Sequence, residues 1–169
     1  MKVDIVRVMV SKRRAATCAL LSLAVATGAW AGATSPTLVL ATGRPVGAAP
    51  PYGVRLTGTF DFENVLQLEV PIELVVFQGS RFVRFPLGGD PLEGTTAAVA
   101  DGILSQSDLP ALDAASSPVG DGARVTALGP TAVGVALPSV FGPGPVTAIV
   151  VARLVEETVF SNPIQVVLP

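Results

Sequence analysis

Hydrophobic and polar residues alternate one by one along much of this chain, which is the period of a β-strand. The clearest segment is 65–77, where leucine, valine and isoleucine alternate with Gln67, Glu69, Pro71 and Glu73. This pattern predicts an antiparallel strand with one face on the core and a polar outer face. Pro71 cannot donate a ladder hydrogen bond, so the strand is expected at a sheet edge or with a bulge there.

Neighbouring segments predict strands that pair with this one. Residues 54–62 alternate in the same way, and Glu63-Asn64 predicts a turn that pairs them with 65–77. Gln78-Gly79-Ser80 predicts a second turn, followed by a returning strand at 81–85. Further segments are expected to form strands at 37–41, 124–128 and 131–137, with a flexible connection at 43–51.

The C-terminal segment has a different pattern. Both faces of 146–155 are mostly apolar, which predicts a central strand covered on both sides. Glu156-Glu157-Thr158 interrupts it, and 159–168 is expected to return beside it. Ser161-Asn162-Pro163 would bulge or kink that return strand.

The middle of the chain is acidic. Asp and Glu residues occur throughout 86–123, where there is no Lys or Arg. A strand is expected at 95–104. Ser107-Asp108-Leu109-Pro110 predicts a single helical turn, in which the hydroxyl caps a backbone amide and the proline is tolerated at the start.

Composition points to one all-β domain. With 17 Gly and 15 Pro in 169 residues, long helices are unfavourable. Segments 124–169 include a strand ending at Leu137-Pro138, a Gly/Pro loop, a long apolar strand and a last strand with Ser161-Asn162-Pro163. This order resembles the closing strands of Ig-like β-sandwich domains of bacterial exported proteins. The resemblance implies an antiparallel Ig-like β-sandwich of about 7–9 strands, although the Cys…Trp…Cys core of antibody domains does not occur after residue 31.

The N-terminus has the layout of a secretory signal peptide. Basic residues precede the apolar run 15–25, and Ala29-Trp30-Ala31 matches an A-x-A cleavage pattern. We expect 1–31 to be a signal peptide and 32–169 to be a single β-sandwich domain, exported to the periplasm or the extracellular space. Ser11-Lys12-Arg13-Arg14 leaves the twin-arginine route open, but small residues follow the pair, which favours general secretion. An uncleaved anchor is the other alternative, and no membrane span is expected after cleavage.

The residues after position 31 exclude several kinds of chemistry. No His, Cys, Lys or Trp occurs there, and the one cysteine of the chain, Cys18, lies in the leader. Ser-His-Asp and Cys-His nucleophiles need a base that this segment lacks, and zinc normally recruits His or Cys. Carboxylates outnumber arginines after residue 31, which disfavours nucleic acid. Asp61 and Glu63 are the pair nearest to a glycosidase arrangement, but a solvated strand end explains them more simply.

The sequence leaves two binding chemistries open. Calcium prefers oxygen ligands, and its candidates are Asp101, Asp108, Asp113 and Asp121. None of these has the D-x-D spacing of a calcium loop, so a solvated acidic surface is the favoured interpretation; no other cofactor is expected. A carbohydrate platform would have only Tyr52, next to Pro51 at a loop edge, and the phenylalanines are expected in the core.

These observations predict an exported, non-catalytic β-sandwich that acts as a structural or binding module. Its partner would be a protein or polysaccharide of the cell envelope. The first alternative is an assembly subunit that exchanges strands with its neighbours. The second is a carboxylate-dependent hydrolase.

Overall fold

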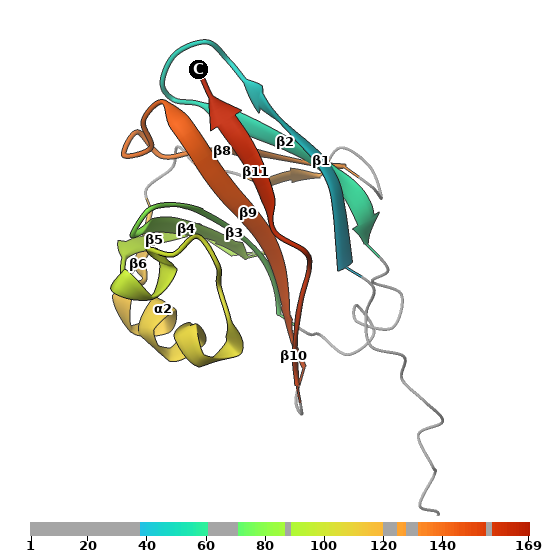
Figure 1. Cartoon of the computed structure of the whole chain (residues 1–169), viewed down its shortest axis with the longest axis vertical. Helices are drawn as coiled ribbons and strands as arrows, with labels where there is room; N and C mark the ends of the chain where they lie inside the picture. The colour runs from blue at the N-terminus through green and yellow to red at the C-terminus, as the bar shows by residue number, and fades with distance from the viewer. Residues whose placement is uncertain (1–37, 61–70, 87–88, 120–124, 128–131, 155–156) are drawn as a thin grey trace, which may run out of the picture. The chain divides into compact units, whose positions relative to one another are not determined.

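The computed structural model describes residues 38–60, 71–86, 89–119, 125–127, 132–154 and 157–169. They belong to one compact unit that spans Ala33–Pro169. Within these ranges the strands form two antiparallel sheets, one of four strands and one of seven (Figure 1). The expected all-β sandwich is confirmed.

The small sheet has the strand order β1-β2-β8-β7. Its strands are β1 (Leu38–Val46), β2 (Gly53–Phe60), β8 (Ala132–Ala136) and β7 (Val125–Ala127). β1 continues to Val46, with a register shift between Leu40 and Thr42, so the expected connection at 43–51 is shorter than predicted.

The large sheet has the order β10-β9-β3-β4-β5-β6, and β11 also pairs with β9. Its strands are β3 (Ile72–Gln78), β4 (Arg81–Pro86), β5 (Leu92–Thr95), β6 (Ser117–Pro118), β9 (Gly144–Arg153), β10 (Thr158–Phe160) and β11 (Ile164–Leu168). The predicted turn after β3 is confirmed: Gln78 pairs with Arg81, and Gly79 has φ +59°.

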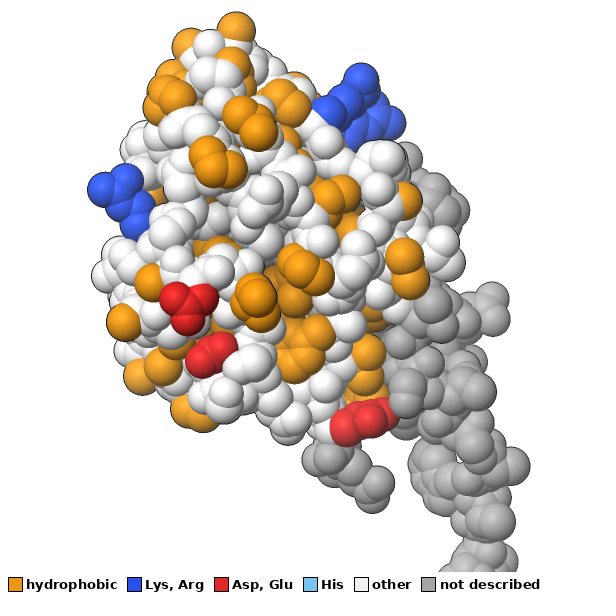
Figure 2. All heavy atoms as spheres, in the orientation of Figure 1, with side chains coloured by type: hydrophobic (Ala, Val, Ile, Leu, Met, Phe, Trp, Pro, Cys, Tyr) orange, Lys and Arg blue, Asp and Glu red, His pale blue; other side chains and the backbone are white. Residues whose placement is uncertain are grey.

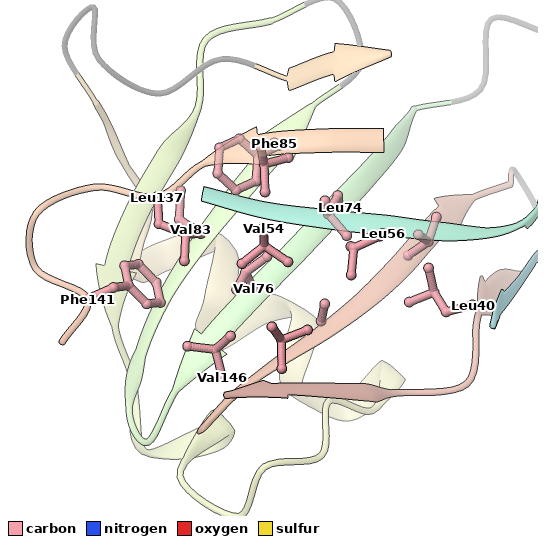
Figure 3. Packing of buried hydrophobic residues seen from close by; sticks show 14 of the residues in the cluster. Leu40, Val54, Leu56, Leu74, Val76, Val83, Phe85, Leu137, Phe141 and Val146 are labelled. Carbon is pink, nitrogen blue, oxygen red and sulfur yellow. The ribbon is translucent and has the colours of Figure 1, made fainter. Parts of the chain in front are cut away.

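The sandwich core lies between the two sheets. Val54 and Leu56 of β2 lie in one cluster with Leu74 and Val76 of β3 and with side chains of β4, β8 and β9 (Figure 3). All four of these residues are at most 4% exposed. The one-by-one alternation of the sequence therefore sets which side chains enter this core.

β9 is the central strand that its two apolar faces predicted. Val146, Ala148 and Val150 enter the sandwich core, whereas Ile149 and Val151 belong to a second cluster on the outer face of the large sheet. β9 is paired with β3 on one side and with β10 and β11 on the other.

A helical segment covers that outer face. We call residues 97–115 the helical cover; it contains the 3-10 helices η1 (Ala97–Val99) and η2 (Gln106–Asp108) and the helix α2 (Leu109–Ala115) (Figure 1). The second cluster joins it to the sheet through Val75, Phe77, Phe82, Val99, Leu104, Leu109, Leu112, Ile149 and Val151. The strand expected at 95–104 is therefore wrong.

Local hydrogen bonds explain why this segment is helical. Thr96 accepts a bond from the N–H of Ala98 (3.3 Å), and this bond starts η1. The predicted helical turn at 107–110 is confirmed and extended, with Pro110 in the first turn of α2. The capping residue differs: the Ser105 N–H donates to Asp108 Oδ2 (2.9 Å), and Ser107 shares a hydrogen bond with the Ser105 hydroxyl instead of capping the helix.

Three predictions for the segment 54–77 are wrong. β3 is an interior strand between β4 and β9, so the sheet-edge alternative for Pro71 is wrong; the other alternative, a bulge at Pro71, stays a prediction, because Pro71 adjoins the undescribed residues 61–70. Glu73 is only 3% exposed, because the helical cover turns the expected outer face into a buried one. β2 and β3 lie in different sheets and do not pair. The predicted turn at Glu63-Asn64 and residues 65–70 lie outside the described ranges.

The kink predicted at Ser161-Asn162-Pro163 is confirmed, and it separates β10 from β11. Ser161 is buried, and its Oγ accepts a bond from the N–H of Val150 (2.9 Å). The Asn162 amide accepts from the N–H of Leu40 (2.9 Å) and donates to its carbonyl (2.8 Å). Asn162 thus ties the return strand of the large sheet to β1 of the small sheet.

Candidate functional site

Four charged side chains meet where the helical cover lies on the large sheet. We call Glu73 (β3), Arg84 (β4), Arg153 (β9) and Asp113 (α2) the charge cluster. Strand register places its three sheet residues together. Arg84 is opposite Val75, which is two residues from Glu73 on β3. Glu73 is opposite Val151, which is two residues from Arg153 on β9. Asp113 reaches them from α2.

The arginines bind the carboxylates in fork geometry. Arg84 donates from Nε and Nη2 to the two oxygens of Glu73, with the Nη2–Oε1 distance 2.7 Å. Arg153 donates from Nη1 and Nη2 to the two oxygens of Asp113, at 2.9 and 2.8 Å. Such bidentate pairs are strong and fix the orientation of both partners.

Cross contacts join the two pairs into one network. Arg84 Nη1 lies 3.0 Å from Asp113 Oδ1 and also donates to Ser116 Oγ (3.0 Å). Arg153 Nε lies 2.9 Å from Glu73 Oε1, but it is not aligned as a hydrogen bond, so this contact is electrostatic. Two cations and two anions therefore neutralise each other.

The network shifts the pKa values of its more exposed members, Asp113 and Arg153. The hydrogen bond from Arg153 lowers the pKa of Asp113, and the charges of Arg153 and Arg84 add to this against the effect of burial. The same bond raises the pKa of Arg153. Asp113 thus remains a carboxylate at neutral pH and is suited to anchoring α2 rather than to donating a proton.

The calcium candidates occupy separate places. Asp101 is exposed after η1, Asp108 bonds to Ser105, and Asp113 belongs to the charge cluster. Asp121 lies outside the described residues. Across the part of the chain that the structure describes, no three His, Cys, Asp or Glu residues gather as a metal site would require.

Other sequence candidates are also placed or left out. Tyr52 lies at the edge of the loop before β2, as expected, but it is 4% exposed and packs in the sandwich core, so its ring cannot serve as a sugar platform. The expected core phenylalanines are confirmed for Phe77, Phe82, Phe85 and Phe141, which are at most 1% exposed. Asp61 and Glu63 lie outside the described ranges.

A pocket that sequence reasoning missed lies beside β5. This β5 pocket has a volume of about 680 Å³ and is lined by, among others, Arg81, Glu93, Thr95, Ser117, Ser139 and Val140. It brings together β4, β5, β6 and the loop between β8 and β9. The sequence signal for this pocket is the pair of polar residues Glu93 and Thr95, two positions apart on one strand. Only the pairing of β4 with β5 shows that Arg81 lies on the same face.

The visible surface and the helices add two findings. On the face drawn in Figure 2, basic side chains stand apart and form no continuous patch. Among the described residues, no helix has the length and apolar character needed to cross a membrane.

Comparison with known proteins gave no match to any protein-family model, curated protein or solved structure.

Proposed function

We propose that this protein is an exported, non-catalytic β-sandwich that acts as a structural or binding module of the cell envelope. The observation that carries the proposal is the charge cluster. Its buried members, Glu73 and Arg84, are bound to each other, and its outer members hold the helical cover on the sheet. A network of this kind supports a rigid scaffold, because its ionised groups are already committed to each other.

The edges of the two sheets favour a self-contained module over a subunit that exchanges strands. β6 is two residues long and contains Pro118, which offers no N–H to an added strand. The return strand of the large sheet is interrupted at 161–163. The Asn162 side chain is hydrogen-bonded to both the backbone N–H and the carbonyl of Leu40 on β1. Short, interrupted or occupied edges are unfavourable templates for β-augmentation.

The oligomeric state tests this choice. Protein recovered after export should give a single monomeric mass by gel filtration with light scattering, at every concentration. A series of oligomers at multiples of the monomer mass, or a polymer, would contradict the module and support the assembly subunit. Deleting β11 (Ile164–Leu168) provides the comparison, since losing the return strand would expose the edge of β9.

Export rests on the leader and has its own test. Cleavage after Ala31 predicts a mature protein that begins at Gly32, which intact mass spectrometry can measure. Changing Ala29 and Ala31 to leucine should block processing, while changing Trp30 should not. A product that retains residues 1–31 in the unaltered chain would contradict the cleaved signal peptide.

The hydrolase alternative is decided by turnover. The proposal expects no hydrolysis of chromogenic glycosides by the purified protein. Turnover that disappears in Asp61→Asn or Glu63→Gln, but persists in Asp101→Asn, would establish the hydrolase in its place.

A further inference from the structure

Glu93 lines the β5 pocket, and one of its carboxylate oxygens has no hydrogen-bond partner among the described residues. Glu93 Oε2 is shielded from solvent, and no described residue donates a hydrogen bond to it. No ion pair links Glu93 to a residue of the described chain either, in contrast to Glu73 and Asp113. Unsatisfied buried acceptors are costly and uncommon, so the Glu93 carboxylate has an unused capacity to accept a hydrogen bond.

A cation lies on the same face of the sheet without pairing with Glu93. Arg81 is opposite Thr95, and Val83 is opposite Glu93, so Arg81 and Glu93 are diagonal neighbours on β4 and β5. Diagonal neighbours have Cα atoms about 7–8 Å apart. Arg81 instead donates from Nη1 to the carbonyl of Val140 (2.7 Å), which holds the guanidinium at the pocket wall.

The backbone explains why these side chains face the pocket. A Cβ on Gly94 would lie 2.8 Å from Phe82 Cζ and would collide with the carbonyl of Ala115, so Gly94 faces the helical cover. Side chains alternate along a strand, so Glu93 and Thr95 face the other way. Ser117 is opposite Glu93 and shares its face.

We propose that the β5 pocket binds a small zwitterion, with its ammonium group against Glu93 and its carboxylate against Arg81. The hydroxyls of Thr95, Ser117 and Ser139 line the same pocket and offer further hydrogen bonds. A dipeptide carries an ammonium group at one end and a carboxylate at the other, so it offers one charged group to each of these two side chains. This inference deepens the proposed function by naming a ligand class for the module.

Titration of the exported protein with glycylglycine tests the proposal by calorimetry or by NMR shifts. We expect saturable binding with a dissociation constant in the millimolar range. N-acetylglycylglycine lacks the ammonium group and glycylglycine amide lacks the carboxylate, so each should bind about tenfold more weakly or not at all. Because these arms use the unaltered protein, they do not depend on any variant folding.

Variants assign the two charges. Glu93→Gln and Arg81→Gln should each weaken glycylglycine binding about tenfold, because each removes one charge-assisted contact. Asp101→Asn, an exposed carboxylate in the same acidic stretch, should leave binding unchanged. The thermal midpoint of Glu93→Gln should not fall, since this carboxylate has no partner to lose.

The outcomes separate this inference from the proposed function. Absence of glycylglycine binding, equal binding of all three compounds, or preferential binding of a neutral sugar such as glucose would overturn the zwitterion site. A monomeric protein without turnover would still be a module in each of these cases. Equal loss of binding in Asp101→Asn would also overturn the assignment to Glu93 and Arg81.

Discussion

The inner face of the large sheet buries hydrophobic side chains against the small sheet, whereas its outer face buries Glu73 and Arg84 beside an apolar cluster. Both faces are thus covered, but by different means. Removing a charge from water is costly, and hydrophobic residues of similar volume are often equally stable. The outer face therefore gains orientation from its ion pairs: the fork contacts to Asp113 fix where α2 lies on the sheet.

The largest expected effect comes from the apolar side of this comparison. Phe85 is fully buried in the sandwich core, so Phe85→Ala should lower the free energy of unfolding by about 3–5 kcal/mol, measured by denaturant titration. Phe82, on the same strand but under the helical cover, provides the matched variant, and Phe82→Ala should cost a similar amount. A loss below about 1 kcal/mol in Phe82→Ala alone would show that the cover does not pack on the sheet.

Breaking the charge cluster should cost about 3 kcal/mol. Glu73→Leu leaves Arg84 buried without its main partner, and breaking one half of a buried pair is strongly destabilising. The double variant Glu73→Leu/Arg84→Met replaces both charges by apolar groups and should recover most of this loss. If the single and double variants unfold at the same denaturant concentration, the charges do not act as a pair.

Sequence alone could predict the inner face but not the outer one. The alternation of Leu74 and Val76 with their neighbours predicted the sandwich core, and the two apolar faces of β9 predicted its central place. The same alternation placed Glu73 in solvent, because nothing local reveals that Arg84, Arg153 and Asp113 will surround it. Their sequence separations from Glu73 range from eleven residues to eighty, so only the assembled fold brings them together.

Local chemistry was informative where it acts over a few residues. Gly79 at the turn after β3 and the polar kink at 161–163 were found correctly, since turn residues determine the backbone nearby. The strand predicted at 95–104 is wrong, because Val99 and Leu104 pack on the sheet from a segment with a 3-10 helix, where side chains do not alternate as in a strand. The β5 pocket could not be predicted, since Arg81 and Glu93 meet only through strand pairing.

Close backbone contact should make one glycine essential to the outer face. A Cβ at Gly94 would collide with the carbonyl of Ala115 at the end of α2, so Gly94→Ala should displace the cover and cost about 1–3 kcal/mol. Gly142→Ala is the control, because open space surrounds that position and its backbone is not left-handed. Thermal unfolding followed by circular dichroism measures both; equal midpoints would contradict the tight contact.

The smallest effect is a pH dependence from Asp113. The folded state lowers its pKa, so its contribution is present above the unfolded value of 3.8 and is lost as pH falls through the lower folded value. Its side chain is 44% exposed, so solvent screening limits the contribution to about 0.5–1 kcal/mol. Asp113→Asn should therefore be less stable than the unaltered protein at pH 7 and should differ little from it at pH 2, whereas Asp101→Asn should match it at pH 7.

Native-state hydrogen exchange tests the central claim, which is that the helical cover is a fixed part of this fold. The backbone amides that donate hydrogen bonds within α2 should exchange slowly at pH 7. Those of β9 should exchange at similar rates. Glu73→Leu should accelerate exchange in 109–115 more than in 146–151. Exchange of 109–115 at the rate of an unstructured peptide, while β9 stays protected, would contradict a covered outer face.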